Sequence, residues 1–206
     1  SSPESIVAPA ESPTSSCAPP ISNSAFAASA SSARAFASVC AASMFHKMTA
    51  EQWGQVINTN LSSLFNMCRA VIEGMRERNF GRIINIASAH GLVASPFKSA
   101  YVAAKHGIIG LTKVTALETA EANITCNAIC PGYVYTPLVE AQIDSQAKAH
   151  GISREQVIHD VLLAQQPNKH FASVEELGAL TVFLASEAAA SITGTALPVD
   201  GGWTAH

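Results

Sequence analysis

The stretch Ser88–Lys105, SAHGLVASPFKSAYVAAK, places a serine, a tyrosine and a lysine at spacings that suit one proton-transfer site. Tyr101 and Lys105 are four residues apart in a run of helix formers, so they share one face of a helix. A tyrosine hydroxyl ordinarily titrates near pH ~10, and a cation one turn away favours its ionised form. Ser88 follows the apolar run Ile83–Ile86, where its hydroxyl can donate to an oxygen that Tyr101 protonates or deprotonates. Together these groups indicate a site for alcohol and carbonyl redox chemistry.

A tyrosine with a lysine four residues later is a weak signal alone, because ordinary lysine usage produces it at about one tyrosine in twenty. Alone it also fits an exposed helical pair of little energetic consequence. The order of elements is more specific: an apolar strand at residues 82–87 leads to Ser88, a helix carries Tyr101 and Lys105, and a second apolar strand at 124–130 runs into a Pro-Gly pair. Strand, helix and strand of these lengths favour a parallel crossover, with both strands ending at the edge where ligands bind. The predicted fold class is α/β with a doubly wound parallel sheet.

This pattern resembles the short-chain dehydrogenase/reductase family, whose active-site serine, tyrosine and lysine match Ser88, Tyr101 and Lys105. The resemblance runs from about Phe45 to the C-terminus and implies a Rossmann-like sheet with a nicotinamide cofactor, taken here as NAD. It also implies that Asn60, in a helix beginning near Thr49, holds a water that passes protons to the lysine. The plainer interpretation of Asn60 is a polar residue on a solvated helix face.

The loop PGYVYTP at residues 131–137 resembles the segment of this family that meets the nicotinamide. The resemblance implies cofactor contacts at Pro131, Gly132, Val134 and Thr136, in addition to Tyr101 and Lys105 of the helix. A rigid turn between a strand and a helix is the alternative interpretation of the same loop.

Residues 1–43 differ in character from the rest of the chain, because Ala, Ser and Pro dominate them and no glycine precedes Gly54. A dinucleotide-binding fold needs glycines in its first strand-to-helix turn, so that the backbone can approach the pyrophosphate. The family's glycine-rich loop and its Asn-Asn-Ala-Gly segment have no counterpart here. We therefore expect residues 1–43 to be a truncated or frame-shifted, corrupted remnant of the nucleotide-binding half, with a natural disordered tail as the alternative. Residues 44–206 are expected to form the C-terminal part of a dehydrogenase domain with its catalytic site and substrate lid.

Further elements follow from periodicity and capping signals. Thr49 and Gln52 form a capping box for a helix through about Arg78, with an apolar stripe of Trp53, Val56, Ile57, Leu61, Leu64, Phe65 and Cys68. Two helical patterns at 138–165, split around Gly151, resemble the family's mobile lid. The remaining predictions are a helix at 99–120, a helix at 173–186 that begins with a second capping box, and a strand at 196–199.

The residues around the site narrow the resemblance to the hydroxybutyrate dehydrogenases of this family, through SAHGLVAS, Lys98, VEAQ and the ending DGGWTA. A lysine and an amide donor can hold a carboxylate by charge-assisted hydrogen bonds. The resemblance implies that His90, Lys98 and Gln142 grip the substrate carboxylate, and that Tyr133 and Trp203 line the pocket. Tyr133 stands where these enzymes have tryptophan. The implied activity is NAD-dependent interconversion of D-3-hydroxybutyrate and acetoacetate, with a small hydroxy acid as the substrate.

Two other functions stay open. The segment FHKMTAEQW after Met44 is closer to the acetoacetyl-CoA reductases of the same superfamily, whose thioester substrate has no free carboxylate for Lys98 to bind. Without a glycine-rich turn the chain also fits a non-catalytic remnant or an interaction module. The residue that selects NAD over NADP belongs to the segment without a counterpart.

Length and composition limit the number of domains, the possible partners and the cellular location. The length of 206 residues suits one domain, and a net charge of -3 favours neither nucleic acid nor an acidic membrane surface as partner. No apolar run reaches the roughly 20 residues that span a bilayer, and no secretory signal is visible. Five scattered cysteines without a CxxC pair predict reduced thiols in a cytoplasmic protein with no metal site. The family resemblance implies a homotetramer formed through the helices at 49–78 and 99–120.

Overall fold

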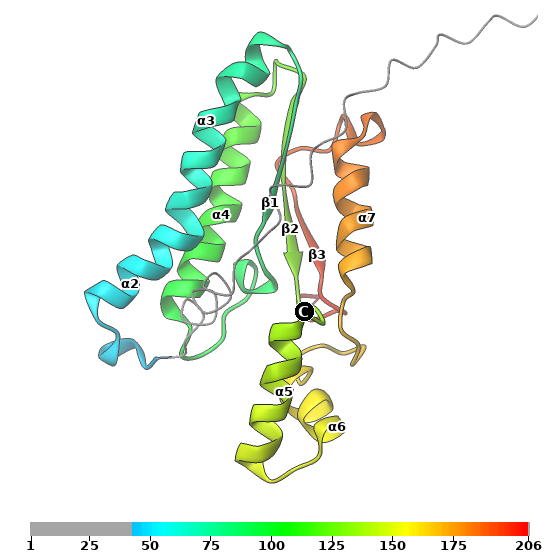
Figure 1. Cartoon of the computed structure of the whole chain (residues 1–206). Helices are drawn as coiled ribbons and strands as arrows, with labels where there is room; N and C mark the ends of the chain where they lie inside the picture. Colours follow the sequence, from blue (N-terminus) through cyan, green and yellow to red (C-terminus); the bar gives the residue numbers. More distant parts are fainter. Residues whose placement is uncertain (1–42, 206) are drawn as a thin grey trace, which may run out of the picture.

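A computed structural model describes residues 43–205, so the predicted low-complexity segment lies, apart from its last residue, outside the described residues. The centre is a parallel sheet of β1 (Gly81–Ile86), β2 (Ile124–Pro131) and β3 (Ala196–Val199), in the order β1-β2-β3. Figure 1 shows α3 and α4 on one face of this sheet and α7 on the other. The α/β class with a parallel sheet is confirmed. The helices are α2 (Ala50–Ile57), α3 (Ser63–Glu77), α4 (Ser99–Glu118), α5 (Pro137–His150), α6 (Arg154–Gln156) and α7 (Val174–Ala185).

The helical segment after Thr49 begins with the predicted capping box. The Thr49 hydroxyl accepts the Gln52 amide at 3.2 Å, and the Gln52 side chain accepts the Thr49 amide at 3.0 Å. The helix then widens into a π-helical turn at Asn58–Ser62 before α3 begins. Asn60 lies in this turn, where its side-chain amide donates to the Val56 carbonyl at 3.0 Å. An amide that bonds the preceding turn competes with the regular backbone ladder, and π turns often occur at functional sites.

The predicted apolar stripe of this helical segment is only partly buried. Val56 and Cys68 are buried, whereas Trp53 and Phe65 are 40% and 48% exposed. Cys68 packs with Ile83 of β1 in one core cluster. The sequence stripe is therefore wider than the face that the described sheet and α4 cover.

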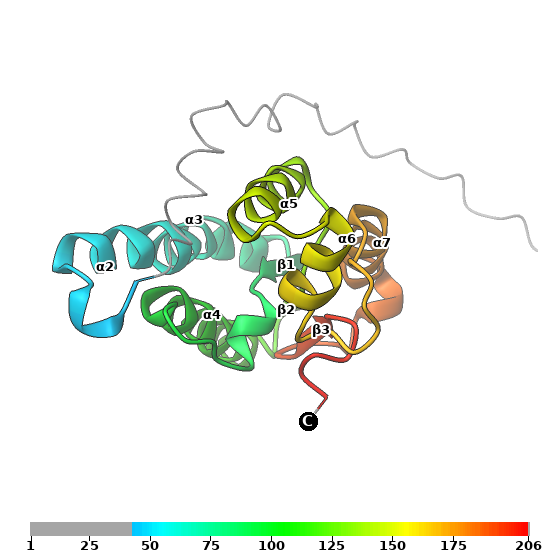
Figure 2. The ribbon, with the colours of Figure 1, turned by 90° about the horizontal axis from the view of Figure 1, so that it is seen from below.

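The two longer strands differ in how fully they are covered. All residues of β2 are buried, as a central parallel strand requires. In β1 buried and half-buried residues alternate, and Ile86 is 51% exposed. Within the part of the chain that the structure describes, β1 is therefore covered less completely than β2. Figure 2 shows the reason, because β1 forms one edge of the sheet, between α3 and α7.

The region predicted as a lid folds beyond the carboxyl ends of the strands (Figure 1). Helix α5 ends at Gly151, whose φ of +64° is the left-handed conformation that glycine adopts at helix ends. Ile143, Val157 and Leu162 form a small core of this region, and Tyr133 packs against it. The lid therefore has its own apolar anchor on the loop after β2.

Two further sequence predictions concern membranes and cysteines. Within residues 43–205 no helix is both long and apolar enough to cross a bilayer. Cys68, Cys126 and Cys130 are buried free thiols.

Gly91, which follows the β1 carboxyl end closely, provides a test of packing between that segment and α4. A Cβ at Gly91 would lie 2.8 Å from the Lys105 carbonyl oxygen, so Gly91→Ala must displace the helix backbone. We expect a loss of about 1 to 3 kcal/mol in the free energy of unfolding, measured by urea denaturation. Gly110→Ala is the control, because nothing lies within 4 Å of its Cβ in α4. Gly110→Ala should raise the free energy of unfolding by about 0.5 to 1 kcal/mol. Equal effects of the two substitutions would contradict the close packing of Gly91 against α4.

Candidate active site

Ser88 stands immediately beyond the carboxyl end of β1, at the start of a short 3-10 turn, Ala89–Gly91. Its Oγ accepts the His90 amide at 3.2 Å. A hydroxyl that accepts through a lone pair retains its own hydrogen for donation. Ser88 is therefore fixed by the turn while its donor remains available for a substrate oxygen.

Tyr101 and Lys105 lie one turn apart on α4, as the spacing predicts. Lys105 is only 7% exposed, and its Nζ donates to the Ile86 carbonyl of β1 at 3.1 Å. The same Nζ is 5.5 Å from the centroid of the Tyr101 ring. A buried ammonium is costly unless it is hydrogen-bonded, so this contact ties the cation to the β1 end and holds its charge beside the phenol.

His90 is buried between two aromatic rings. Its ring centroid is 5.8 Å from that of Tyr101 and 5.0 Å from that of Trp203, both in edge-to-face geometry. Its Nε2 is 3.0 Å from the Ser95 hydroxyl. Burial, with smaller contributions from Lys98 and His106, lowers the pKa of His90 to about 4. At neutral pH the imidazole therefore carries no charge and can contribute only hydrogen bonds and packing.

Trp203 extends this arrangement to the loop after β2. Its ring is stacked on Tyr133 with 6.1 Å between centroids and 7° between planes. We call the four rings Tyr101, His90, Trp203 and Tyr133 the aromatic column. The carboxylate of Asp200 fixes the turn that carries Trp203, because it accepts the Gly202 amide and both the amide and hydroxyl of Thr204.

Gln166 is a residue of this region that the sequence analysis missed. It is 1% exposed; its Oε1 accepts the Tyr133 amide, and its Nε2 donates to the His170 carbonyl at 2.7 Å. The side chain thereby joins the end of the lid to the loop after β2. No spacing signal around residue 166 indicates this role, because the contact is made across the fold. Ser95, the partner of His90, was missed for the same reason.

The residues expected to contact the cofactor surround the carboxyl end of β2. Pro131 is the last residue of β2, and the Gly132 amide donates to the Val199 carbonyl at 3.0 Å. Val134 forms an isolated bridge with Ala172. The Thr136 hydroxyl caps α5 by accepting the Val139 amide at 3.4 Å. The loop is thus held by backbone contacts and a helix cap. These contacts are compatible with both a cofactor-binding loop and a rigid turn.

Two expected substrate residues occupy different places. Lys98 stands at the N-cap of α4, and its charge acts on His90, so it lies near the aromatic column. Gln142 is exposed on α5, and within the described residues no hydrogen bond joins it to the column. Its neighbour Ile143 is buried in the lid core. The structure therefore places Lys98 close enough to His90 for its charge to act there, and it shows Gln142 as an exposed residue of α5.

Comparisons with known proteins agree with this geometry. A family model described as enoyl-(acyl carrier protein) reductase matches residues 29–204. D-beta-hydroxybutyrate dehydrogenase of Rhizobium meliloti (strain 1021) is 61% identical over 156 residues, which are 76% of this chain and 60% of the relative. The chain belongs to the short-chain dehydrogenase/reductase family. Acetoacetyl-CoA reductase of Shinella zoogloeoides is 44% identical over 77% of this chain and 61% of that relative.

Comparison of the fold with solved structures also finds similar reductases. A variant of actinorhodin polyketide ketoreductase with NADPH matches with a TM-score of 0.73 and 33% identity, over 80% of this chain and 64% of that one. Like the match to the Rhizobium relative, this one covers less than two thirds of the longer chain. This member of the short-chain dehydrogenase/reductase family therefore spans about 60% of the length of the curated relatives it matches.

The family uses NAD or NADP, and the described residues fit one end of such a cofactor. Asn60 and Lys105 line a cavity of about 520 Å³, so two polar side chains face the same open space beside α4 and the end of β1. The first glycine of the chain is Gly54, inside α2, so the described residues contain no glycine-rich turn at the start of a parallel sheet. Within residues 43–205, the residues expected at the nicotinamide end are therefore present, whereas no glycine-rich turn for a pyrophosphate is found.

The buried His90 makes stability depend on pH. Its pKa is about 4 in the folded chain against 6.5 ordinarily, so between these values the unfolded chain binds the proton more readily. As pH falls from 6.5 to 4, we expect the free energy of unfolding of the parent chain to decrease by on the order of 2 kcal/mol. The His90→Phe variant should not show this decrease. Urea unfolding at several pH values measures the difference. His46→Phe, at an exposed position, should follow the parent chain, and identical pH profiles for parent and His90→Phe would contradict a buried neutral imidazole.

Proposed function

We propose that this dehydrogenase interconverts D-3-hydroxybutyrate and acetoacetate with NAD. The observation that carries the proposal is the Lys105 ammonium, buried beside the Tyr101 ring at the carboxyl end of β1, with Ser88 following the same strand. Similarity to D-beta-hydroxybutyrate dehydrogenases at 54 to 61% identity supports the substrate. The tetrameric, cytoplasmic state implied by the family resemblance belongs to the same proposal. Exposed apolar side chains on α3 and α4, Phe65 and Leu117 among them, support association through those helices.

In the oxidation direction, Tyr101 acts as the general base that takes the proton from the substrate hydroxyl. The positive charge of Lys105 favours the phenolate that this step requires. Ser88 donates a hydrogen bond to the reacting oxygen. NAD, when bound, accepts the hydride. Asn60 faces the same cavity as Lys105 and holds the water through which the proton reaches solvent.

The substrate carboxylate is held by charge and the carbon chain by the aromatic column. Lys98 provides the positive charge, since the imidazole of His90 is neutral at the working pH. His90 then contributes a hydrogen bond and fixes the Tyr101 ring. Trp203 and Tyr133 form an apolar wall. Gln142 reaches the carboxylate when α5 moves toward the aromatic column, which is a lid movement.

Acetoacetyl-CoA reduction is the second candidate, and the 44% identity to an acetoacetyl-CoA reductase favours it. A thioester has no carboxylate at the end that reacts, so that substrate would not use the charge of Lys98 to bind a carboxylate. The effect of Lys98 on each substrate therefore distinguishes the two candidates.

Removal of the Tyr101 hydroxyl tests the chemistry. Tyr101→Phe keeps the ring contact with His90 but loses the base, so we expect NADH formation from D-3-hydroxybutyrate and NAD to fall by roughly a thousandfold. Thermal unfolding should change little. Tyr135→Phe, at an exposed ring 5.5 Å from Phe171, is the matched control and should retain full activity. Appreciable turnover by Tyr101→Phe would exclude Tyr101 as the base.

Neutralisation of Lys98 tests the substrate. Lys98→Gln should raise KM for free acetoacetate by about tenfold or more, with a smaller effect on kcat, because a charge-assisted bond contributes roughly 1.5 to 3 kcal/mol. It should leave turnover of acetoacetyl-CoA unchanged. Lys113→Gln, on the exposed part of α4, serves as the control. If parent turnover is faster on the thioester and insensitive to Lys98, the second candidate replaces the first.

A further inference from the structure

Gln166 joins two backbone segments that are distant in the sequence, and no step of the proposed reaction uses it. Its Oε1 accepts the Tyr133 amide, and its Nε2 donates to the His170 carbonyl at 2.7 Å. We call these two bonds the Gln166 clamp. Because the side chain is only 1% exposed, its bonds are shielded from water. The clamp therefore fixes the loop after β2 to the segment that precedes α7.

The clamp occupies space that Gly132 leaves open. A Cβ on Gly132 would overlap the Gln166 Oε1 and would lie 2.9 Å from the Cα of Asp200. These three residues therefore meet at one point, where β2 and β3 both end. The clamp thus lies between the loop that carries Tyr133 and the turn that carries Trp203.

The backbone of Tyr133 is bound on both sides by the segment before α7. Its amide donates to Gln166, and its carbonyl accepts the Ala172 amide at 2.9 Å. The next bond along the loop also involves Ala172, whose carbonyl accepts the Tyr135 amide at 3.2 Å. The position of the Tyr133 ring therefore follows the position of residues 166–172.

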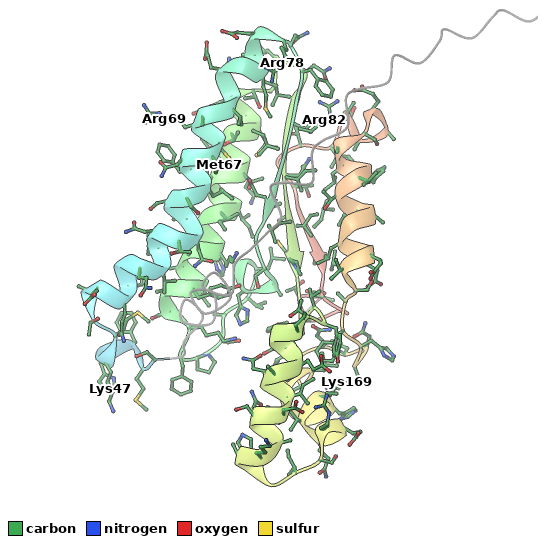
Figure 3. All side chains as sticks on the ribbon, viewed as in Figure 1. Lys47, Met67, Arg69, Arg78, Arg82 and Lys169 are labelled. Carbon is green, nitrogen blue, oxygen red and sulfur yellow. The ribbon has the colours of Figure 1, made fainter. Side chains whose placement is uncertain are left out.

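The same segment also holds the turn that carries Trp203. The Asn168 amide donates to the Gly201 carbonyl at 3.2 Å, and a Cβ on Gly201 would overlap the Asn168 side chain. Lys169 closes the segment from the other side, because its Nζ donates to two carbonyls of the preceding turn at 2.8 and 3.0 Å. Figure 3 labels Lys169 in this segment, beside the lid helices. Residues 166–169 are thus attached to both loops that carry the stacked rings.

The stacked rings of Tyr133 and Trp203 form the apolar wall that the proposed substrate contacts. A wall whose two parts are tied to one segment cannot recede to admit a longer carbon chain. We propose that Gln166 is a positioning residue, which sets the width of the substrate pocket through Tyr133 and so selects short 3-hydroxy acids. This inference rests on the proposed function for the identity of the substrate, whereas the placement of the Tyr133 ring does not depend on that function.

The emission of Trp203 reports the position of the wall without any substrate. The chain has two tryptophans, so Trp203 is the only indole in a Trp53→Phe background. It is 6% exposed and stacked on Tyr133. Gln166→Met replaces the amide by an apolar chain of similar length. It should shift the emission to longer wavelength, because the Tyr133 ring moves away and water reaches the indole. Unchanged emission would overturn positioning by Gln166.

The width of the pocket is measured by kcat/KM for D-3-hydroxybutyrate and for its five-carbon homologue, D-3-hydroxypentanoate. We expect the parent chain to prefer the four-carbon acid by about tenfold or more, and Gln166→Met to reduce that preference by about threefold or more. A parent chain without this preference, or an equal loss for both acids in the variant, would overturn the proposal. If the parent chain oxidises neither acid, the proposed function fails, and the Trp203 emission alone decides whether Gln166 positions the wall.

Asn127→Leu is the matched control. Asn127 is 0% exposed, its Nδ2 donates to the Ile192 carbonyl at 2.7 Å, and its Oδ1 accepts the Thr195 amide at 3.3 Å. It is thus a buried amide clamp of the same kind, in the middle of β2. The control should lower the urea midpoint by an amount similar to that of Gln166→Met. It should leave the substrate preference and, in the same background, the Trp203 emission unchanged.

Gln166→Asn keeps the amide but is one methylene too short to reach both partners. It takes the place of Gln166→Met if that variant does not fold, and it should shift the emission and the substrate preference in the same directions. No shift in either readout, or an equal response of Asn127→Leu, would overturn the proposal.

Discussion

The hydrogen bond from Lys105 to the Ile86 carbonyl is the contact on which the site depends. It joins α4 to the end of β1 and places a buried cation beside the Tyr101 ring. A buried ammonium is costly unless it is hydrogen-bonded, and Lys105 is only 7% exposed. The contact therefore satisfies a buried donor and fixes the position of α4 relative to the end of β1. The absence of a side chain at Gly91 permits this approach, because a Cβ there would collide with the Lys105 backbone.

A second set of contacts reaches the tyrosine from the end of the chain. The Asp200 carboxylate holds the turn that carries Trp203, Trp203 packs on His90, and His90 packs on Tyr101. In the other direction Trp203 stacks on Tyr133, whose amide is bound by Gln166 at the end of the lid. Gln166 and Tyr133 thus connect the region after α6 to the aromatic column. A neutral His90 suits this position, because a charged imidazole would be poorly solvated between two rings.

Local sequence signals predicted local structure well. The capping boxes at Thr49 and Ser173 are present, and the strand at 196–199 has the predicted bounds. Tyr101 and Lys105 share a helix face because that relation depends only on spacing. Contacts between residues that are far apart in the sequence could not be predicted from spacing or capping signals. The Gln166 clamp and the neutral state of His90 depend on which distant groups surround them, and the exposure of Ile86 depends on a neighbouring strand that the described residues do not supply.

Burial differs between the strands that position the candidate site. β2 is buried along its whole length, and α4 packs on it through Ile108 and Ile109. Tyr101 and Lys105 are carried by the helix that packs on this buried strand, whereas Ser88 follows β1, whose last residue Ile86 is 51% exposed. Within the described residues no strand lies beside the outer edge of β1, where Ile86 is exposed and the Arg82 Nε has no hydrogen-bond partner. In residues 43–205 the arrangement of Ser88, Tyr101 and Lys105 is therefore set by the packing of α4 on β2 and by the contact of Lys105 with the end of β1.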